Sequence, residues 1–347
     1  SITYATFEDL QIDLGTGDDT FTIESTHGSP TTVSAGAGDD RIIANSNAAT
    51  LTLNGDQNDD TIDLNGTGAE VTINAGADTD TVNINGVSHR LTVNGQAGAD
   101  TINAKQTAAS SNSTLNGDAG NDVFNVLAMN GPVSIRGGAD SDTVNVSNVA
   151  PRLSAGIRTV PTGTIDNINA KLTVDGGDDT GDVLNVDDSA APTDNKTGTL
   201  TNATLGDLQL EQDIAYTGLA ELHIWLGAGA NTFDINSTHS TQTTLYAAAG
   251  TDTVNVNDAS GRLTINAEQG DDVINVRATR PASTVVINGH EGVDTINVSD
   301  LSPSKPASLT ETVGSIDAID GKVEINGGAD TDTINVDNSA DSNDRAG

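Results

Sequence analysis

The chain has 347 residues, a formal net charge of −36 at pH 7, one Trp, three Tyr, four Phe and no cysteine. So large an excess of acid excludes nucleic acid as a partner and insertion into an anionic membrane, and it favours cation binding or a highly solvated surface. A compact core of this size would need more Leu, Phe and Met, while a strict apolar repeat excludes the disorder typical of acidic chains poor in aromatic residues.

A unit of about 20 residues recurs along the chain, and the segment 91–104, LTVNGQAGADTINA, shows its parts. Leu91 and Val93 alternate with polar residues, which predicts a half-buried strand. A tight turn, 95–100, follows. The alternation then resumes with Ile102 and Ala104, so the unit is one strand, one Gly/Asp turn and a second strand.

The last Asp of the turn marks each repeat, and we call it the marker. Most steps between neighbouring markers are 20 to 22 residues, which is the period of a solenoid. Asn231 takes the same place once. The other markers are Asp19, Asp40, Asp60, Asp80, Asp100, Asp122, Asp142, Asp182, Asp252, Asp272, Asp294 and Asp332.

Apolar pairs flank each marker, as Leu51/Leu53 and Ile62/Leu64 do around Asp60. Each coil is therefore expected to bury about four modest apolar side chains. The turn has nearly constant length, which indicates a constraint from geometry or a ligand. The other connection varies, and it includes long Pro-containing loops at 147–170 and 299–321.

A longer repeat predicts two units. The first 27 residues return from Asp213 onward, and the coil around Asp182 returns around Asp332. These two offsets differ by about three coils, which a solenoid tolerates because its coils contact only their neighbours. We predict a first solenoid unit at 1–212, with eight clear coils and an irregular join at 187–212. A second unit at 213–347, with five clear coils, continues it.

The fold class predicted from these patterns is all-β: a right-handed parallel β-solenoid, of the β-roll or β-helix kind, with two strands per coil of about 20 residues. At about 4.8 Å per coil, a continuous stack would form a rod of roughly 60–80 Å.

The residue two places before the marker is Gly, Asn or Asp in nearly every coil, which predicts a left-handed backbone there. The markers need another explanation. Stacking would place their carboxylates roughly 5 Å apart, where each neighbouring pair repels by about 3 kcal/mol. One alternative is that each Asp accepts hydrogen bonds from turn amides. We expect instead that Ca²⁺ ions bridge the markers, helped by further acids. The helpers are Asp18, Asp39, Asp59 and Asp271.

The turns resemble the G-G-x-G-x-D-x-U-x nonapeptide of RTX (haemolysin-type) calcium-binding β-rolls. The segments 14–21, LGTGDDTF, and 117–124, GDAGNDVF, each depart from it at one Gly. The resemblance implies several bound Ca²⁺ ions held by the marker aspartates and turn carbonyls. RTX rolls carry two such turns per coil and this chain carries one, so calcium is expected along a single edge.

Outward strand positions are mostly Thr and Asn, so an ice-binding face is one alternative function. Both strands carry the same pattern, which favours exposed strands with stacked Asn ladders instead. A β-helix polysaccharide-processing enzyme is a second alternative. Lys and Arg are scattered, however, and no pairing of a nucleophile with a base is present, so we predict that the chain is not an enzyme.

Trp225 and Tyr246 occupy outward positions of adjacent coils, where the first repeat has Asp13 and Ser34. The pair is either a partner-contact patch or is covered by the join. From the whole sequence we expect a structural, calcium-stabilised extracellular protein: a segment of a surface filament, surface layer or adhesin stalk at the cell surface. Matching repeats at both ends of the chain also predict end-to-end self-association.

Overall fold

A computed structural model describes residues 7–149, 153–154, 157–158, 163–177, 181–191, 195–302 and 314–340. None of these residues is helical, so this part of the chain has no helix able to cross a membrane. Contacts divide the chain into unit 1 (1–159, 165–185 and 210–220) and unit 2 (160–164, 186–209 and 221–347). Because this division follows contacts rather than the sequence repeat, the boundary predicted at residue 212 stays a prediction.

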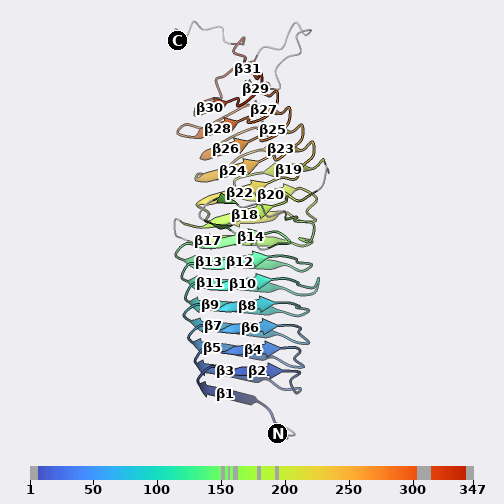
Figure 1. Cartoon of the computed structure of the whole chain (residues 1–347), viewed down its shortest axis with the longest axis vertical. Helices are drawn as coiled ribbons and strands as arrows, with labels where there is room; N and C mark the ends of the chain where they lie inside the picture. Colours follow the sequence, from blue (N-terminus) through green and yellow to red (C-terminus); the bar gives the residue numbers. More distant parts are fainter. Residues whose placement is uncertain are drawn as a thin grey trace. The chain divides into compact units, whose positions relative to one another are not determined.

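Each unit is a parallel β-solenoid with two strands per coil, which confirms the predicted fold class (Figure 1). In unit 1 one sheet contains the strands that precede the turn: β1 (Leu10–Thr16), β3 (Thr31–Ala37), β5 (Leu51–Gln57), β7 (Val71–Ala77), β9 (Leu91–Ala97), β11 (Ser113–Ala119), β13 (Val133–Ala139), β17 (Leu172–Gly177) and β21 (Ile214–Thr217).

The second sheet of unit 1 contains the strands that follow the marker: β2 (Thr20–Ile23), β4 (Arg41–Ala44), β6 (Thr61–Leu64), β8 (Thr81–Ile84), β10 (Thr101–Ala104), β12 (Val123–Val126), β14 (Thr143–Val146) and β18 (Val183–Asp187). A short antiparallel hairpin, β15 (Leu153–Ser154) with β16 (Ile157–Arg158), lies in the first long loop. Most of the second long loop, 303–313, is outside the described residues.

Unit 2 repeats the arrangement with five-residue strands before the turn: β22 (Glu221–Trp225), β24 (Gln242–Tyr246), β26 (Arg262–Asn266), β28 (Thr284–Asn288) and β30 (Lys322–Asn326). The strands after the marker are β23 (Thr232–Ile235), β25 (Thr253–Val256), β27 (Val273–Val276), β29 (Thr295–Val298) and β31 (Thr333–Val336).

Residues at equal places in the repeat pair directly, so the core is a stack of identical layers. Leu91 pairs with Val71 and Ile102 pairs with Val82, and all four side chains are at most 2% exposed. The predicted apolar pairs therefore form the core. Successive coils are held in register because a slip by one residue would turn every apolar side chain outward.

The join carries a hairpin that the sequence did not predict. Strands β19 (Thr197–Leu200) and β20 (Thr204–Asp207) pair antiparallel, and β19 pairs in parallel with β23 of the same unit. Leu200, Leu205 and Leu208 are at most 1% exposed. The leucines of the join thus extend the core of unit 2.

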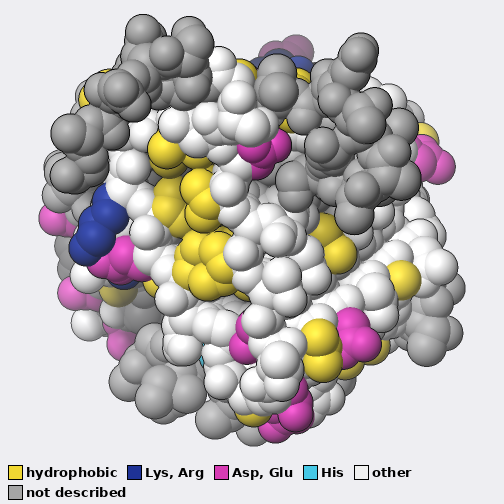
Figure 2. All heavy atoms as spheres, turned by 90° about the horizontal axis from the view of Figure 1, so that it is seen from above, with side chains coloured by type: hydrophobic (Ala, Val, Ile, Leu, Met, Phe, Trp, Pro, Cys, Tyr) yellow, Lys and Arg dark blue, Asp and Glu magenta, His cyan; other side chains and the backbone are white. Residues whose placement is uncertain are grey.

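The last described coil of unit 2 is open on one side. Ile334 and Val336 of β31 are 52% and 62% exposed, whereas their partners in β29, Ile296 and Val298, are 0% and 7% exposed. Apolar side chains also gather on the face of the molecule seen from above in Figure 2.

Candidate functional site

The marker residues form a continuous ladder of hydrogen bonds from coil to coil. In unit 1 the backbone N–H of each marker donates to Oδ1 of the marker one coil later, over 2.7–2.9 Å from Asp19 to Asp182. In unit 2 the same bonds run over 2.7–3.0 Å from Asn231 to Asp332. Each carboxylate from Asp40 to Asp182, and from Asp252 to Asp332, therefore accepts a turn amide of the preceding coil.

Marker side chains point into the solenoid. Ten of them, from Asp40 to Asp294, are between 0% and 3% exposed, while Asp19 and Asp332 in the outermost described coils are half-buried. Small residues five places earlier make room for the carboxylate: a Cβ added to Gly95 would lie 2.5 Å from Oδ2 of Asp100. In eight markers Oδ2 is buried and accepts no hydrogen bond: Asp40, Asp60, Asp80, Asp100, Asp122, Asp252, Asp272 and Asp294.

Asn231 shows which chemistry suits that inner position. Its Oδ1 accepts the N–H of Lys196 at 3.0 Å, as a marker Oδ1 does elsewhere. Its Nδ2 donates to the carbonyl oxygens of Gly227 at 2.9 Å and Gly229 at 3.0 Å. The inner atom of the marker therefore faces backbone carbonyls, which need a donor. An ionised Asp would place an acceptor there.

Burial raises the pKa of seven marker carboxyl groups: Asp60, Asp80, Asp100, Asp122, Asp252, Asp272 and Asp294. The pKa rises to about 7 for Asp60, Asp80, Asp122 and Asp272, and to about 6 for Asp252. Desolvation is the largest cause and the charge of neighbouring aspartates adds to it in the first four, while the hydrogen bond from the preceding coil lowers the pKa in all five. A protonated Oδ2 would be a donor, as Nδ2 of Asn231 is.

Calcium fits the marker row poorly. Carboxylate and carbonyl oxygens are the right kind of ligand, but Ca²⁺ takes six to eight of them. In every marker Asp after Asp19, one oxygen is already held by a turn amide. Across the described residues, no three His, Cys, Asp or Glu side chains gather closely enough to hold a metal ion. The geometry favours a proton over a calcium ion at the markers, and calcium there stays a prediction.

The helper acids occupy a second, exposed position of the turns, in unit 1 at Asp18, Asp39 and Asp59 and in unit 2 at Asp271. Asp18 and Asp39 each accept the backbone N–H of the equivalent residue one coil later, at 3.1 and 3.3 Å. Asp59 and Asp271 do the same toward Thr79 and Val293, at 2.9 and 2.8 Å. These bonds run in the opposite direction to the marker ladder. We call these four residues the outer row, and all four are exposed.

The turn contains two left-handed positions. The predicted one is confirmed: φ is 74° at Asn58 and 81° at Asp78, two residues before their markers. A second lies four residues before the marker, where Asp56, Gln96 and Glu268 have φ between 76° and 79°. Gly holds this position with positive φ in several other coils, as at Gly15, Gly36 and Gly76, a signal in the sequence that the prediction did not use.

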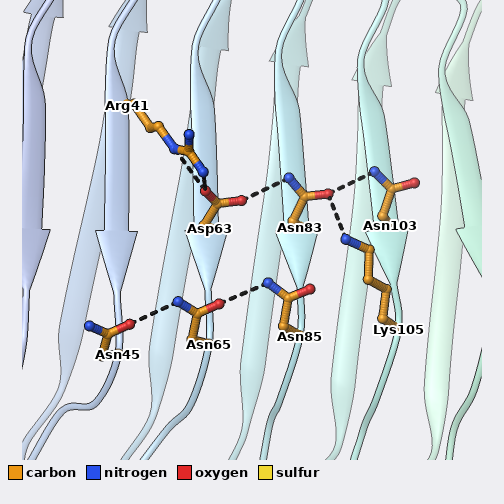
Figure 3. Close-up of polar contacts among 8 residues, drawn as sticks. All are labelled: Arg41, Asn45, Asp63, Asn65, Asn83, Asn85, Asn103 and Lys105. Atoms are coloured by element: carbon orange, nitrogen blue, oxygen red, sulfur yellow. Dashed lines mark hydrogen bonds and ion pairs between the residues drawn. The ribbon is translucent and has the colours of Figure 1, made fainter.

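Columns of Asn side chains run along both sheets of unit 1, and Figure 3 shows two columns from the sheet that contains β6, β8 and β10. Several members, such as Asn125 and Asn145, are buried. In the column of β8, β10, β12, β14 and β18, each Nδ2 donates to Oδ1 of the preceding coil at 2.8–3.0 Å, from Asn103 to Asn185. A second column joins Asn74, Asn94 and Asn116 at 2.8 Å. The predicted Asn ladders are thus present, and all their amides point the same way.

Carboxylates lie at the start of several Asn columns, which the sequence did not predict, whereas the column of Asn74 begins through Asn54 at the hydroxyl of Ser34. Asn83 donates to Asp63 at 2.9 Å, and Arg41 holds the other oxygen of Asp63 at 2.6 Å. Two other columns begin in the same way: Nδ2 of Asn45 donates to Glu24, and Nδ2 of Asn255 donates to Asp234. A column that donates toward earlier coils needs an acceptor at its first member, and a carboxylate is the strongest one.

Trp225 and Tyr246 stack on each other, with ring centroids 5.2 Å apart and ring planes at 3°. Both side chains are half-buried, and they pair in register across β22 and β24. His223 lies beside Trp225 at 5.6 Å. A buried ion pair, Lys196 with Asp188 at 2.7 Å, was missed by sequence reasoning.

Neither the family models nor the curated proteins contain a match to this chain. Its function is therefore inferred from the sequence and the geometry.

Proposed function

We propose that this protein is a structural repeat protein, a solenoid segment of an extracellular surface filament, surface layer or adhesin stalk. The observation that carries the proposal is the marker ladder, which links every clear coil of a unit to the next through a buried hydrogen bond. Ladders of this kind resist shear between coils, because all the bonds along a unit must be loaded together.

The likeness to RTX β-rolls supports a role for calcium in the same protein. Since the marker carboxylates are buried and bonded, we place the proposed Ca²⁺ ions on the outer row, Asp18, Asp39, Asp59 and Asp271. Those carboxylates are exposed, and each accepts only one backbone N–H among the described contacts.

End-to-end association is also proposed. The exposed apolar side chains of Ile334 and Val336, on a strand that pairs only with β29 among the described residues, support a further coil at that edge. That coil would come from a continuation of the same chain or from a second copy. Sedimentation separates these two sources, since a strict monomer at high concentration rules out the second copy.

Force spectroscopy tests the structural role. Pulling the chain by its two ends should give successive force peaks, each releasing about 70 Å for a coil of about 20 residues. Asp100→Ala should lower the force at one peak. Extension without force peaks would contradict a load-bearing role.

A further inference from the structure

One outward column of unit 2 changes from aromatic to amide side chains. Trp225, Tyr246, Asn266 and Asn288 pair in register across β22, β24, β26 and β28. Because the two rings are stacked and parallel, one face of Tyr246 lies on Trp225. The opposite face is on the side of Asn266, whose shorter side chain leaves space in the next coil.

A groove of about 770 Å³ lies at this place, and Tyr246 and Asn266 line it together with Glu268, His290 and Glu291. Gln269, Gly328 and alanines from the turns complete the lining, and Nε2 of Gln269 donates to Oε2 of Glu291 at 3.4 Å. This volume is within the range of small-ligand sites in proteins. The groove thus combines one aromatic face with several polar groups.

The polar groups include a donor that the column cannot use. In the columns described above, each Asn donates to a side-chain oxygen of the preceding coil, whether amide, carboxylate or hydroxyl, but the coil before Asn266 offers Tyr246 instead. Oδ1 of Asn266 accepts Nδ2 of Asn288 at 2.9 Å, while Nδ2 of Asn266 has no acceptor among the described residues. Carboxylates of Glu268 and Glu291 add acceptors to the same groove.

We propose that this groove binds a neutral saccharide, with one pyranose ring stacked on Tyr246 as the next member of the Trp225–Tyr246 stack. An aromatic face accommodates the C–H face of a sugar ring, while the hydroxyl groups meet donors and acceptors at its edge. Glu268 and Glu291 would repel an anionic sugar. The site rests on unit 2 alone and does not depend on the load-bearing role.

Trp225 is the only Trp of the chain, so its fluorescence reports directly on the stack. The intact protein is titrated with cellohexaose, laminarihexaose and mannohexaose, and with trigalacturonate as the anionic probe. We expect a saturable change in Trp225 emission with at least one neutral hexasaccharide, and at least tenfold weaker binding of trigalacturonate.

The affinities of the variants are measured by calorimetry, because an exchange of Tyr246 changes the emission of the stacked Trp225 even without a ligand. Tyr246→Ala should weaken binding by at least about tenfold and Tyr246→Phe should preserve it. If Tyr246→Ala fails to fold, Glu268→Gln supplies the test instead. This exchange changes the packing little, and it should also weaken binding. Ser34→Ala, at the counterpart of Tyr246 in the first repeat, is the matched control and should bind like the parent.

Three results would overturn the proposal. These are no saturable binding of any neutral hexasaccharide up to about 10 mM, parental affinity in both folded Tyr246→Ala and Glu268→Gln, or preferential binding of trigalacturonate.

Discussion

A marker Asp in this solenoid is a buried hydrogen-bond acceptor first and an acid second. Oδ1 of Asp100 accepts the buried backbone N–H of Asp80 at 2.8 Å. Among the described residues, this is the hydrogen bond that the N–H of Asp80 makes. Burial of an unpaired N–H costs more than the bond itself contributes, so the side chain is needed wherever the turn recurs.

Replacing this acceptor should therefore be costly. Asp100→Ala leaves the buried N–H of Asp80 without a partner, and we expect a loss of about 1–3 kcal/mol in the free energy of unfolding. Asp100→Asn keeps Oδ1 and adds the donor seen at Asn231, so its stability should equal or exceed that of the parent at pH 8. Denaturant melts of both variants give the comparison.

Thr79→Ala is the control for these two changes. Thr79 is an exposed residue of the adjacent turn, and its hydrogen bond to Asp59 uses the backbone N–H rather than the side chain. The free energy of unfolding of Thr79→Ala should be within about 0.5 kcal/mol of that of the parent. An Asp100→Ala variant as stable as Thr79→Ala would contradict the ladder as a source of stability.

The raised pKa values predict an unusual pH dependence. Between about pH 4 and pH 7 the folded state keeps protons on Asp60, Asp80, Asp122 and Asp272 that the unfolded state has released. The free energy of unfolding then falls as pH rises through this window. In metal-free buffer the melting temperature should be higher at pH 5 than at pH 8. A melting temperature that rises from pH 5 to pH 8 would show that the row folds ionised.

At the scale of the element, the Asn columns are polar in direction. Every amide donates toward the preceding coil, so the first member needs an acceptor and the last member leaves a carbonyl. The carboxylate of Asp63 takes the first position of one column, while Lys105 approaches the carbonyl of Asn83 at 3.4 Å. The sequence places these charges where the columns begin, much as acids are placed at the beginning of helices.

Exchange of Asp63 tests this arrangement. Asp63→Ala removes the acceptor of Asn83 and the partner of Arg41, and should cost about 1–3 kcal/mol. Asp63→Asn keeps an acceptor and loses only the charge, so it should cost less than half as much. Thermal melts of the two variants measure the difference, and equal losses would show that the ion pair rather than the column matters.

Sequence reasoning found the repeating elements and missed their connections. Alternation of Leu91 and Val93 with polar residues predicted strand, face and core, because one buried face fixes the register. The marker row and the left-handed position before it were also predicted. The inward direction of the carboxylates was not, since it depends on the small residue, such as Gly95, five places earlier. The sequence also did not reveal the antiparallel pairing of β19 with β20, because only the leucines of this segment suggested that it packs on the core.

At the scale of the whole molecule, 50 acidic residues face only 14 basic ones. Protons can neutralise Asp60, Asp80, Asp122 and Asp272, whose pKa is raised by burial, while carboxylates exposed to water repel one another. Divalent cations reduce that repulsion wherever carboxylates line up from coil to coil, as Asp18, Asp39 and Asp59 do.

We therefore expect calcium to act through the outer row and mainly at high pH. Millimolar Ca²⁺ should raise the melting temperature at pH 8 by mass action on the folded state, and EDTA should reverse the rise. At pH 5 the rise in melting temperature with Ca²⁺ should be smaller, because protons on buried markers such as Asp60 and Asp80 already lower the negative charge of the solenoid. The melts are repeated with Mg²⁺ to separate a specific site from screening.

Two variants decide which acids take part. The double variant Asp39→Asn with Asp59→Asn should remove most of the calcium response, because it takes two adjacent carboxylates out of the exposed stack. Asp100→Asn should leave the response unchanged, since that carboxyl group is buried and bonded to Asp80. If Asp100→Asn abolishes the response and the double variant keeps it, calcium occupies the marker row, and the marker turns would have to open to admit it. If neither EDTA nor Ca²⁺ changes melting at pH 8, calcium has no part in the stability of this solenoid.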